Sequence, residues 1–239
     1  MNPHSDLLRV SCIIAVYNGE AYLHEAIDSL LAQTYPSLEI VVVNDGSTDG
    51  TAEVMARYGS RIRSLHQENL GVSVARNSGV AMSTGTLLSF LDADDRLDPS
   101  KIAMQVAAFT ADPQLDYCDC HAAFFWSPEI SEEARQRDFR YPEPFWKTTV
   151  ARHISSWLFR RELWDRLGGF SPALRYAEDI DWLSRARDLP MRQETLPHVL
   201  THRRLHRNNV TARRRGEQAA SLADTFKAHL VRIRSRTAK

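Results

Sequence analysis

The chain has 239 residues, of which 43% are hydrophobic and 25% are charged. This composition excludes disordered and collagen-like chains, and it allows one large domain with a full hydrophobic core. The first ten residues lack a basic stretch followed by an apolar core, and no apolar run reaches the ~18 residues of a membrane span. We therefore expect a cytoplasmic protein whose three cysteines are reduced thiols, since an odd number does not make a disulfide framework.

The formal net charge is zero, but the charges are unevenly distributed along the chain. Residues 201–239 contain eleven Lys or Arg and two acidic residues, a net charge of +9, which leaves −9 on the rest. A basic segment binds phosphates, an anionic membrane surface or nucleic acid, or it forms a solvated helix face. Because no aromatic residue interrupts Arg213–Arg215, we do not expect nucleic-acid binding, whereas peripheral membrane contact stays open.

Strands and helices alternate in the first hundred residues. Apolar runs rich in β-branched residues predict buried strands at 10–16 and 38–43, and apolar residues at helical spacing predict a helix at 20–33. The turn "NDGSTDGT" leads into a helix running to about Tyr58, with Thr48 as its predicted N-cap. A strand at 61–66, a helix at 71–82 and a strand at 86–91 follow.

The predicted elements are less regular after Pro99. We expect a helix at about 99–110, strands at 115–124 and 154–159, a short helix in "RELWDRLGGF" capped by Gly168, and helices at 178–188 and 216–234. Residues 127–150 contain three prolines and no clear period, which predicts a long loop beside a site. In "CDCH", strand alternation places Cys118 and Cys120 on one face and favours core packing over a metal site.

Alternating strands and helices at this spacing indicate an α/β fold with a parallel, doubly wound sheet. Ligands of such sheets bind beyond the carboxyl ends of the strands. Tyr17, Asn44, Asp45 and Asp92 all fall at predicted strand ends. We therefore expect a ligand site at that edge of the sheet.

The stretch "FLDADDRLDP" places four carboxylates within seven positions after a buried strand. Two unit charges about 5 Å apart repel by roughly 3 kcal/mol at an effective dielectric constant near 20, so such a group needs a cation, a proton or open water. Asp98 is the predicted N-cap of the next helix, which leaves Asp92, Asp94 and Asp95. Oxygen ligands without Cys or His suit Mg²⁺ or Mn²⁺ with a diphosphate, and a surface acidic turn is the alternative.

Several motifs together resemble a known family. "SCIIAVYNGEAYL", "VVVNDGSTDGT", "ENLGVSVARNSG", "LDADD" and "AEDID" are similar, in order and spacing, to the inverting family 2 glycosyltransferases with the GT-A fold. The resemblance covers about residues 9–211 and implies a GT-A domain with a nucleotide-binding part at about 9–98 and an acceptor part at about 99–211. It leaves 1–8 as an N-terminal extension and 212–239 as a basic C-terminal helix.

The resemblance assigns roles on the nucleotide side of the site. It implies that Tyr17 ends the first strand of the nucleotide pocket and that Asp45 accepts the N3–H of a uracil-type base. A carboxylate suits that imide but faces an unprotonated N3 in cytosine, so UDP- or dTDP-sugars are favoured over cytidine donors. Arg76 is similar to the family's basic residue near the nucleotide. An Asx turn at Asp45 and a surface arginine at Arg76 are the alternatives.

The resemblance also assigns the metal and the base. It implies that Asp92 contacts the ribose or the metal region, that Asp94 is the direct ligand of Mg²⁺ or Mn²⁺, and that Asp179 is the catalytic base. Acids favoured at a helix N-terminus are the alternative for Asp179. "RRLHRNNVT" resembles a segment in which a His lies near the metal or diphosphate, so His206 is a candidate ligand, with a structural role as the alternative.

These features predict a metal-dependent, inverting enzyme that transfers a sugar from a nucleotide diphosphate sugar to a hydroxyl of a sugar, peptide or lipid-linked glycan. The chain lacks a "QxxRW" signature, which argues for single additions over processive synthesis. A sugar nucleotidyltransferase would need a basic Gly-rich loop after the first strand, where "VYNGEAYL" has no Lys or Arg. A non-catalytic sugar-nucleotide scaffold would not need Asp179. In the acceptor part, Trp126, Phe145 and Trp146 would contact the acceptor or anchor the loop to the core.

Overall fold

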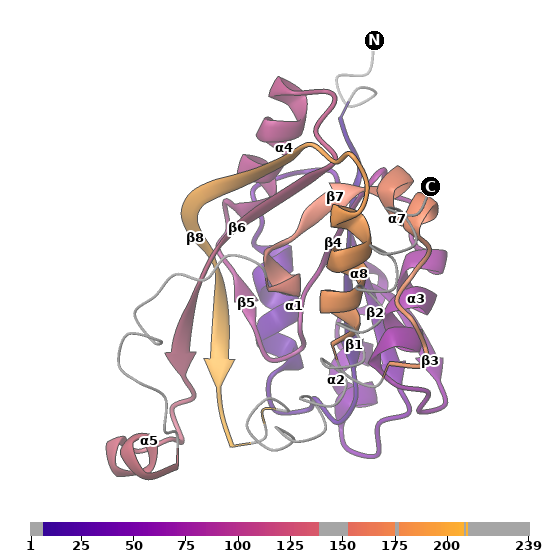
Figure 1. The fold of residues 1–239 in the computed structure, drawn as a ribbon. Coiled ribbons are helices and arrows are strands. Elements are labelled where there is room, and N and C mark those ends of the chain that lie inside the picture. The colour runs from indigo at the N-terminus through magenta and orange to yellow at the C-terminus, as the bar shows by residue number, and fades with distance from the viewer. Residues whose placement is uncertain (1–6, 139–152, 175–176, 208, 210–239) are drawn as a thin grey trace.

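A computed structural model describes residues 7–138, 153–174, 177–207 and 209 (Figure 1). The predicted domain boundary at 211, the terminal helix at 216–234 and the aromatic residues Phe145 and Trp146 lie outside the described residues. Within them, helices cover both faces of one curled sheet, as the α/β prediction requires.

Eight strands form the sheet in the order β3-β2-β1-β4-β7-β6-β8-β5. The strands are β1 (Val10–Val16), β2 (Leu38–Asp45), β3 (Arg63–Gln67), β4 (Leu87–Phe90), β5 (Arg96–Leu97), β6 (Tyr117–Trp126), β7 (Leu158–Arg160) and β8 (Gln193–Leu205). The first four are parallel neighbours, as predicted. Beyond β4 the sheet is mixed, because β7 runs antiparallel to both β4 and β6, and β5 runs antiparallel to β8.

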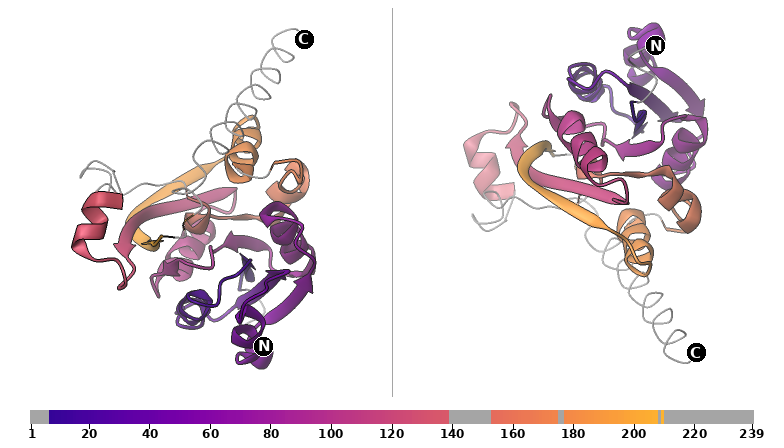
Figure 2. Two further views of the ribbon diagram at one scale, coloured as in Figure 1. Left: turned by 90° about the horizontal axis from the view of Figure 1, so that it is seen from below. Right: turned by 90° about the horizontal axis from the view of Figure 1, so that it is seen from above.

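Helices follow most strands in the chain. They are α1 (Leu23–Leu31), α2 (Thr51–Ala56), α3 (Val72–Met82), α4 (Lys101–Ala111), α5 (Glu132–Asp138), α7 (Arg161–Leu167) and α8 (Glu178–Arg187), with the 3-10 turns η1 (Gly59–Arg61) and η2 (Ile154–Ser156). Gly168 has φ +74° and ends α7, as predicted. α5 lies at the outer end of the β6–β8 pair, away from strands β1 to β4 (Figure 2).

Successive residues of the central strands belong to cores on opposite faces of the sheet. Ile13 packs with Ala75 and Val80 of α3, whereas its neighbour Ile14 packs with residues of α1 and α2. Both β1 residues are fully buried. The uninterrupted apolar runs in the sequence are therefore explained by burial on both faces.

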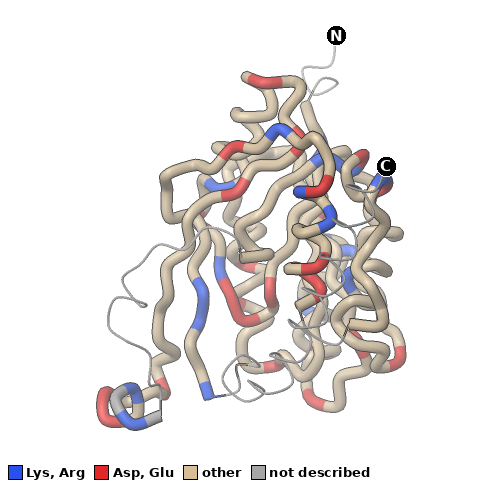
Figure 3. Tube along the Cα trace, in the orientation of Figure 1, with Lys and Arg blue, Asp and Glu red and all other residues tan. Residues whose placement is uncertain are grey.

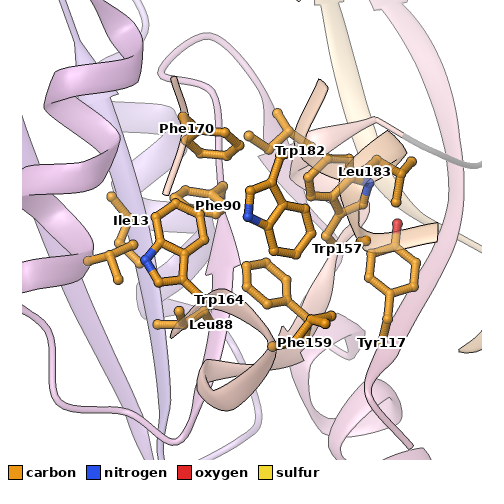
Figure 4. Close-up of a cluster of buried hydrophobic side chains, with 14 of the residues drawn as sticks. Ile13, Leu88, Phe90, Tyr117, Trp157, Phe159, Trp164, Phe170, Trp182 and Leu183 are labelled. Carbon is orange, nitrogen blue, oxygen red and sulfur yellow. The ribbon is translucent and has the colours of Figure 1, made fainter. Parts of the chain in front are cut away.

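Aromatic side chains dominate the core on the α3 face (Figure 4). Trp157 follows η2 directly, and its ring stacks on Trp182 of α8 with centroids 5.8 Å apart. Trp182 also lies against Phe159 of β7 with centroids 4.7 Å apart. This packing ties η2 and the beginning of α8 to the sheet, and both segments carry polar side chains of the site.

Two predicted helix caps are wrong. The N-cap of α2 is Gly50, and the backbone N–H of Thr48 instead donates to Asn18 Oδ1 at 2.8 Å. The N-cap of α4 is Ser100, two residues beyond Asp98. Asp98 Oδ1 accepts hydrogen bonds from Ser100 N at 2.9 Å and Ser100 Oγ at 2.6 Å, which is an Asx turn leading into the helix.

Three elements differ from the prediction, each for an identifiable physical reason. The predicted loop at 127–150 contains α5, whose acidic first turn and basic last turn favour a helix. β5 has two residues and exists only because β8 pairs with it. β8 was not predicted because Pro197 interrupts its strand pattern. The register between β6 and β8 shifts at this proline, and such irregular positions are where a sheet accommodates proline.

Candidate active site

The polar residues predicted at strand ends lie at the carboxyl edge of the parallel strands. Tyr17 follows β1 and is 52% exposed, whereas Asn44 and Asp45 end β2 and are buried. Asp92 follows β4. The parallel arrangement brings these ends to one edge, as the sequence predicts.

Two loops at this edge are joined by hydrogen bonds. Asn18 has a positive φ of 52°, and its backbone N–H donates to Ser47 Oγ at 2.9 Å. Gly19 N donates to Thr51 Oγ1 at 2.9 Å. These bonds join the loop after β1 to the loop after β2 and to the first residue of α2.

Asp45 is buried and accepts three hydrogen bonds from the last residue of β3 and from the segment that follows it. Oδ1 accepts from Gln67 Nε2 at 2.8 Å and from Leu70 N at 2.9 Å, and Oδ2 accepts from Gly71 N at 2.9 Å. A carboxylate offers about four acceptor positions, so one remains, on Oδ2. Asp45 therefore shapes the loop before α3 and retains capacity for one further donor.

Arg76 lies inside the site and not on the helix surface. One guanidinium nitrogen is 2.7 Å from Asp92 Oδ1, and the other pairs with Glu178 Oε1. The Arg76 and Glu178 side chains are buried, and the Arg76 guanidinium lies over the Phe170 ring. Arg76 thus bridges the end of β4 and the first residue of α8.

A compact group of possible metal ligands contains Asp92, Asp95 and His153, with ligand atoms within 4.8 Å of one another. His153 Nε2 is 3.3 Å from Asp92 Oδ2, and its Nδ1 accepts a hydrogen bond from Ser155 N. Asp95 is buried and accepts from Arg204 N at 3.0 Å. His153 was not predicted as a site residue, because nothing in its local sequence marks it.

The charges in this group are largely compensated by protein cations. Burial would raise the pKa of Asp92, but the charge of Arg76 and the hydrogen bond from His153 outweigh it and lower that pKa. Burial and the charge of Asp94 raise the pKa of Asp95 well above its ordinary value. Burial and the charge of Arg203 lower the pKa of His153. With Arg76 and Arg203 beside it, this group has little excess negative charge for a cation.

Asp94 and His206 form a second, more open pair. His206 Nε2 is 2.9 Å from Asp94 Oδ2, and the Asp94 side chain is 31% exposed. Asn209 Nδ2 donates to the same oxygen at 3.3 Å. Asp94 and His206 are 112 positions apart in sequence. They meet because β8 pairs with both β6 and β5.

The donor atoms of this second pair fit a divalent cation. A carboxylate oxygen and an imidazole nitrogen converge there, and within the described part of the chain no Lys or Arg forms an ion pair with the Asp94 carboxylate. In the first group, by contrast, Arg76 pairs with Asp92 at 2.7 Å and His153 presents its Nε2 toward the same carboxylate. The chemistry of the donors therefore favours Asp94 and His206 as the place for a metal.

Asp179 lies in the first turn of α8, between the buried residues Glu178 and Asp181. Its charge acts on the pKa values of Arg76 and His153, so it lies within electrostatic reach of the acidic group. The residue before the helix, Ala177, has a positive φ of 62°. This left-handed residue and the pair of Glu178 with Arg76 set the direction in which α8 begins.

Arg204 binds the backbone of the acidic turn. Its buried guanidinium donates from Nε to the backbone oxygen of Asp94 at 2.9 Å and pairs with Glu25 of α1 at 2.7 Å. Figure 3 shows the basic residues of β8 beside the acidic turn after β4. The sequence had pointed to "RRLHRNNVT" for its histidine only, because an arginine on an unrecognised strand gives no local signal of burial.

The predicted core role of the "CDCH" cysteines is confirmed. Cys118 and Cys120 are free thiols and fully buried, as is Cys12. Burial raises the pKa of both Cys12 and Cys118 to about 12, which is typical of inert thiols. None of the three belongs to the site.

Comparison with known families identifies the class of protein. A family model described as glycosyl transferase family 2 matches residues 11–168. An uncharacterised glycosyltransferase of Rickettsia typhi is 35% identical over 190 residues, which cover 75% of this chain and 58% of that protein. EpsJ of Bacillus subtilis, also an uncharacterised glycosyltransferase, is 32% identical over 194 residues, covering 71% of this chain and 53% of EpsJ. The chain belongs to glycosyltransferase family 2 and spans somewhat more than half the length of these relatives.

Solved structures show the same fold. Staphylococcus aureus TarS in complex with UDP-GlcNAc has a TM-score of 0.66 at 21% identity, over 86% of this chain and 61% of TarS. The mannosyltransferase PcManGT from Pyrobaculum calidifontis, in complex with GDP-Man and Mn²⁺, has a TM-score of 0.70 at 25% identity, over 95% of this chain and 65% of PcManGT. The fold is therefore that of GT-A glycosyltransferases, as predicted. In the described residues, no helix combines the length and apolarity that a membrane span requires.

Proposed function

We propose that this protein is a metal-dependent, inverting and non-processive glycosyltransferase that moves a sugar from a UDP- or dTDP-sugar to an acceptor hydroxyl. The observation that carries this proposal is the 2.9 Å approach of Asp94 Oδ2 and His206 Nε2 at the carboxyl edge of the sheet. Family membership and the nucleotide-sugar complexes of the structural neighbours support it.

The donor nucleotide would bind across the ends of β1 and β2. Exposed Tyr17 offers an aromatic face, and Asp45 has one acceptor position left for the N3–H of uracil or thymine. Arg76 would act indirectly, since its guanidinium is occupied by Asp92 and Glu178. In this proposal Arg76, which the resemblance places near the nucleotide, supports the site by holding Asp92 and Glu178.

Asp94 and His206 would hold Mg²⁺ or Mn²⁺, with Asp92 nearby. The complex of PcManGT with Mn²⁺ supports the use of a divalent ion, and the donor set of the pair supports this placement. When bound, the ion would offset the negative charge of the donor diphosphate.

Asp179 would act as the general base. Its carboxylate would accept the proton of the acceptor hydroxyl while that oxygen bonds to the anomeric carbon and the bond to the diphosphate oxygen breaks. A single displacement of this kind inverts the anomeric configuration. The acceptor would be a hydroxyl of a sugar, peptide or lipid-linked glycan, and a cytoplasmic location and peripheral membrane contact through 212–239 remain parts of the proposal.

Two other functions are less well supported. A sugar nucleotidyltransferase would need basic groups to hold a triphosphate after β1, and the loop there contains Glu20 and no Lys or Arg. A non-catalytic scaffold would not need a general base such as Asp179. Turnover of any nucleotide sugar would exclude the scaffold.

A binding and transfer experiment tests the proposal. Thermal stabilisation is measured with UDP, dTDP, CDP and GDP, each with and without Mn²⁺, and stabilising nucleotides are followed by transfer assays with their sugars. A ligand at 100 times its Kd stabilises a fold by about 2.7 kcal/mol, which such an assay resolves. We expect UDP or dTDP to stabilise only with metal, and the product to carry the inverted anomer by NMR. Equal binding of CDP would contradict the role of Asp45, and a retained anomer would contradict the mechanism.

A further inference from the structure

The ring of His206 lies against the ring of Tyr22. Their centroids are 4.7 Å apart and their planes are inclined by 55°. Tyr22 is the N-cap residue of α1 and comes five residues after Tyr17, whereas His206 directly follows β8. No feature of the sequence assigns Tyr22 a role, yet it contacts the candidate metal ligand.

Tyr22 is itself held from two sides. Its hydroxyl donates to Glu129 Oε1 at 2.6 Å, in the turn after β6. The Arg204 guanidinium lies 4.6 Å from its ring centroid and 4.6 Å from that of Phe125. Since the Arg204 side chain is only 2% exposed and is paired with Glu25, this stack has few alternative arrangements.

The backbone next to His206 is also held. His206 N donates to Asn209 Oδ1 at 2.6 Å, and Asn209 Nδ2 donates to Arg204 O at 3.1 Å. The main chain of His206 is therefore fixed, so the orientation of its imidazole depends on rotation about the side-chain bonds. The Tyr22 ring occupies one side of the imidazole and limits that rotation.

We propose that Tyr22 is a positioning residue that holds the His206 imidazole with Nε2 toward Asp94, so that the two side chains are arranged for the cation before it binds. The inference rests on the placement of the metal at Asp94 and His206 in the proposed function. Groups that orient metal ligands typically change metal affinity by 10- to 100-fold when they are removed. A pre-oriented imidazole loses less conformational freedom on binding, which is the source of that gain.

The experiment measures Mn²⁺ binding to the full chain by EPR, without nucleotide, in Tyr22→Leu, Tyr22→Phe, His206→Ala, Asp94→Ala and the double variant Tyr22→Leu/His206→Ala. We expect Tyr22→Leu to weaken Mn²⁺ binding about 10-fold and Tyr22→Phe, which keeps the ring, to stay close to wild type. In the His206→Ala background, Tyr22→Leu should have no further effect, because its contribution passes through the imidazole. Tyr35→Leu is the matched control: Tyr35 is partly buried, donates to Leu8 O at 2.7 Å and contacts no residue of the site.

A second measurement does not depend on metal. NMR of the metal-free protein should show the His206 ring protons shifted in Tyr22→Leu and unshifted in Tyr22→Phe, since the ring current of residue 22 is lost only in the former. The inference is overturned if the His206 signals do not move in Tyr22→Leu, or if that substitution weakens Mn²⁺ binding equally in both backgrounds. If His206→Ala and Asp94→Ala alone leave Mn²⁺ affinity unchanged, the metal placement in the proposed function is wrong, and the inference falls with it. Those single variants show which of the two has failed.

Discussion

Buried carboxylates lie at the amino and the carboxyl edge of the sheet, but their charges are compensated to different degrees. At the amino edge, Glu39 of β2 accepts from Ser11 Oγ at 2.5 Å and Thr84 N at 2.8 Å, and it pairs with Arg63 at 2.7 Å. Burial opposes ionisation there, yet the hydrogen bonds from Ser11, Thr84 and Arg63 lower the pKa of Glu39 to about 2. The charge is fully compensated, so this group stabilises the fold and has nothing left for a ligand.

At the carboxyl edge, compensation is incomplete at one position. Asp92 and Asp95 are satisfied by Arg76, His153 and the backbone of Arg204. Asp94 faces His206 and solvent. A crowded acidic turn is thus tolerated when most of its charges are neutralised internally and the remaining carboxylate is partly exposed to solvent.

The largest expected effect concerns Asp179, the proposed base. Asp179→Asn keeps the shape of the side chain but removes its basicity, so the transfer rate should fall by roughly 10²- to 10⁴-fold. The affinities for UDP and Mn²⁺ should stay within a few fold, because donor and metal binding do not need the base. Steady-state kinetics and calorimetry on the same preparation measure both. An unchanged transfer rate would remove Asp179 from the chemistry.

The second prediction separates the open carboxylate from a compensated one. Asp94→Ala should abolish metal-dependent UDP binding and leave the free energy of unfolding nearly unchanged, since the Asp94 side chain is partly exposed. Asp95→Ala should instead destabilise the fold by about 1–3 kcal/mol, because the buried Arg204 N–H loses its acceptor. Calorimetry with UDP and Mn²⁺, together with urea denaturation, distinguishes the two. The reverse pattern would place the metal on the Asp92, Asp95 and His153 group.

The third prediction tests the amino edge. Glu39→Gln should lower the free energy of unfolding by about 2 kcal/mol at pH 7 without changing Mn²⁺ or UDP binding. Because the pKa in the folded protein is about 2, below the ordinary value of 4.5, the ionised group stabilises the fold above pH 4.5. That contribution is lost as the pH falls from about 4.5 to about 2, so wild type and variant should converge in acid.

Urea denaturation at pH 7 and at lower pH values measures this difference. Glu53→Gln is the control, since Glu53 is an exposed residue of α2. A stability difference at Glu39 that persisted unchanged in acid would show that the carboxylate charge is not what stabilises this edge.

The smallest effect is expected before α8. A non-glycine residue in the left-handed region costs roughly 1–2 kcal/mol, and glycine avoids this cost but loses about 0.5–1 kcal/mol through its freedom in the unfolded chain. Ala177, at φ 62°, should therefore tolerate Ala177→Gly with a gain of at most about 1.5 kcal/mol in stability. A decrease in the transfer rate alone would indicate that the rigidity of this residue helps to place Asp179. Thermal denaturation and kinetics measure the two effects.

Local sequence determined the parallel half of the fold. Hydrophobic runs in β1 and β2 and the helical spacing in α1 are properties of neighbouring residues, so they predict elements and the edge at which Asp45 and Asp92 lie. The acidic turn after β4 is also contained in one short stretch. These features need no knowledge of distant contacts.

Only the tertiary structure decided which partner each acidic residue of the site has. Asp94 meets His206 across 112 residues because β8 lies between β6 and β5, and Arg76 meets Glu178 across 102 residues because α3 and α8 cover the same face of the sheet. His153 reaches Asp92 through a short turn anchored by Trp157. Burial and partner choice depend on strand order and packing between segments far apart in the chain, and neither periodicity nor local composition contains that information.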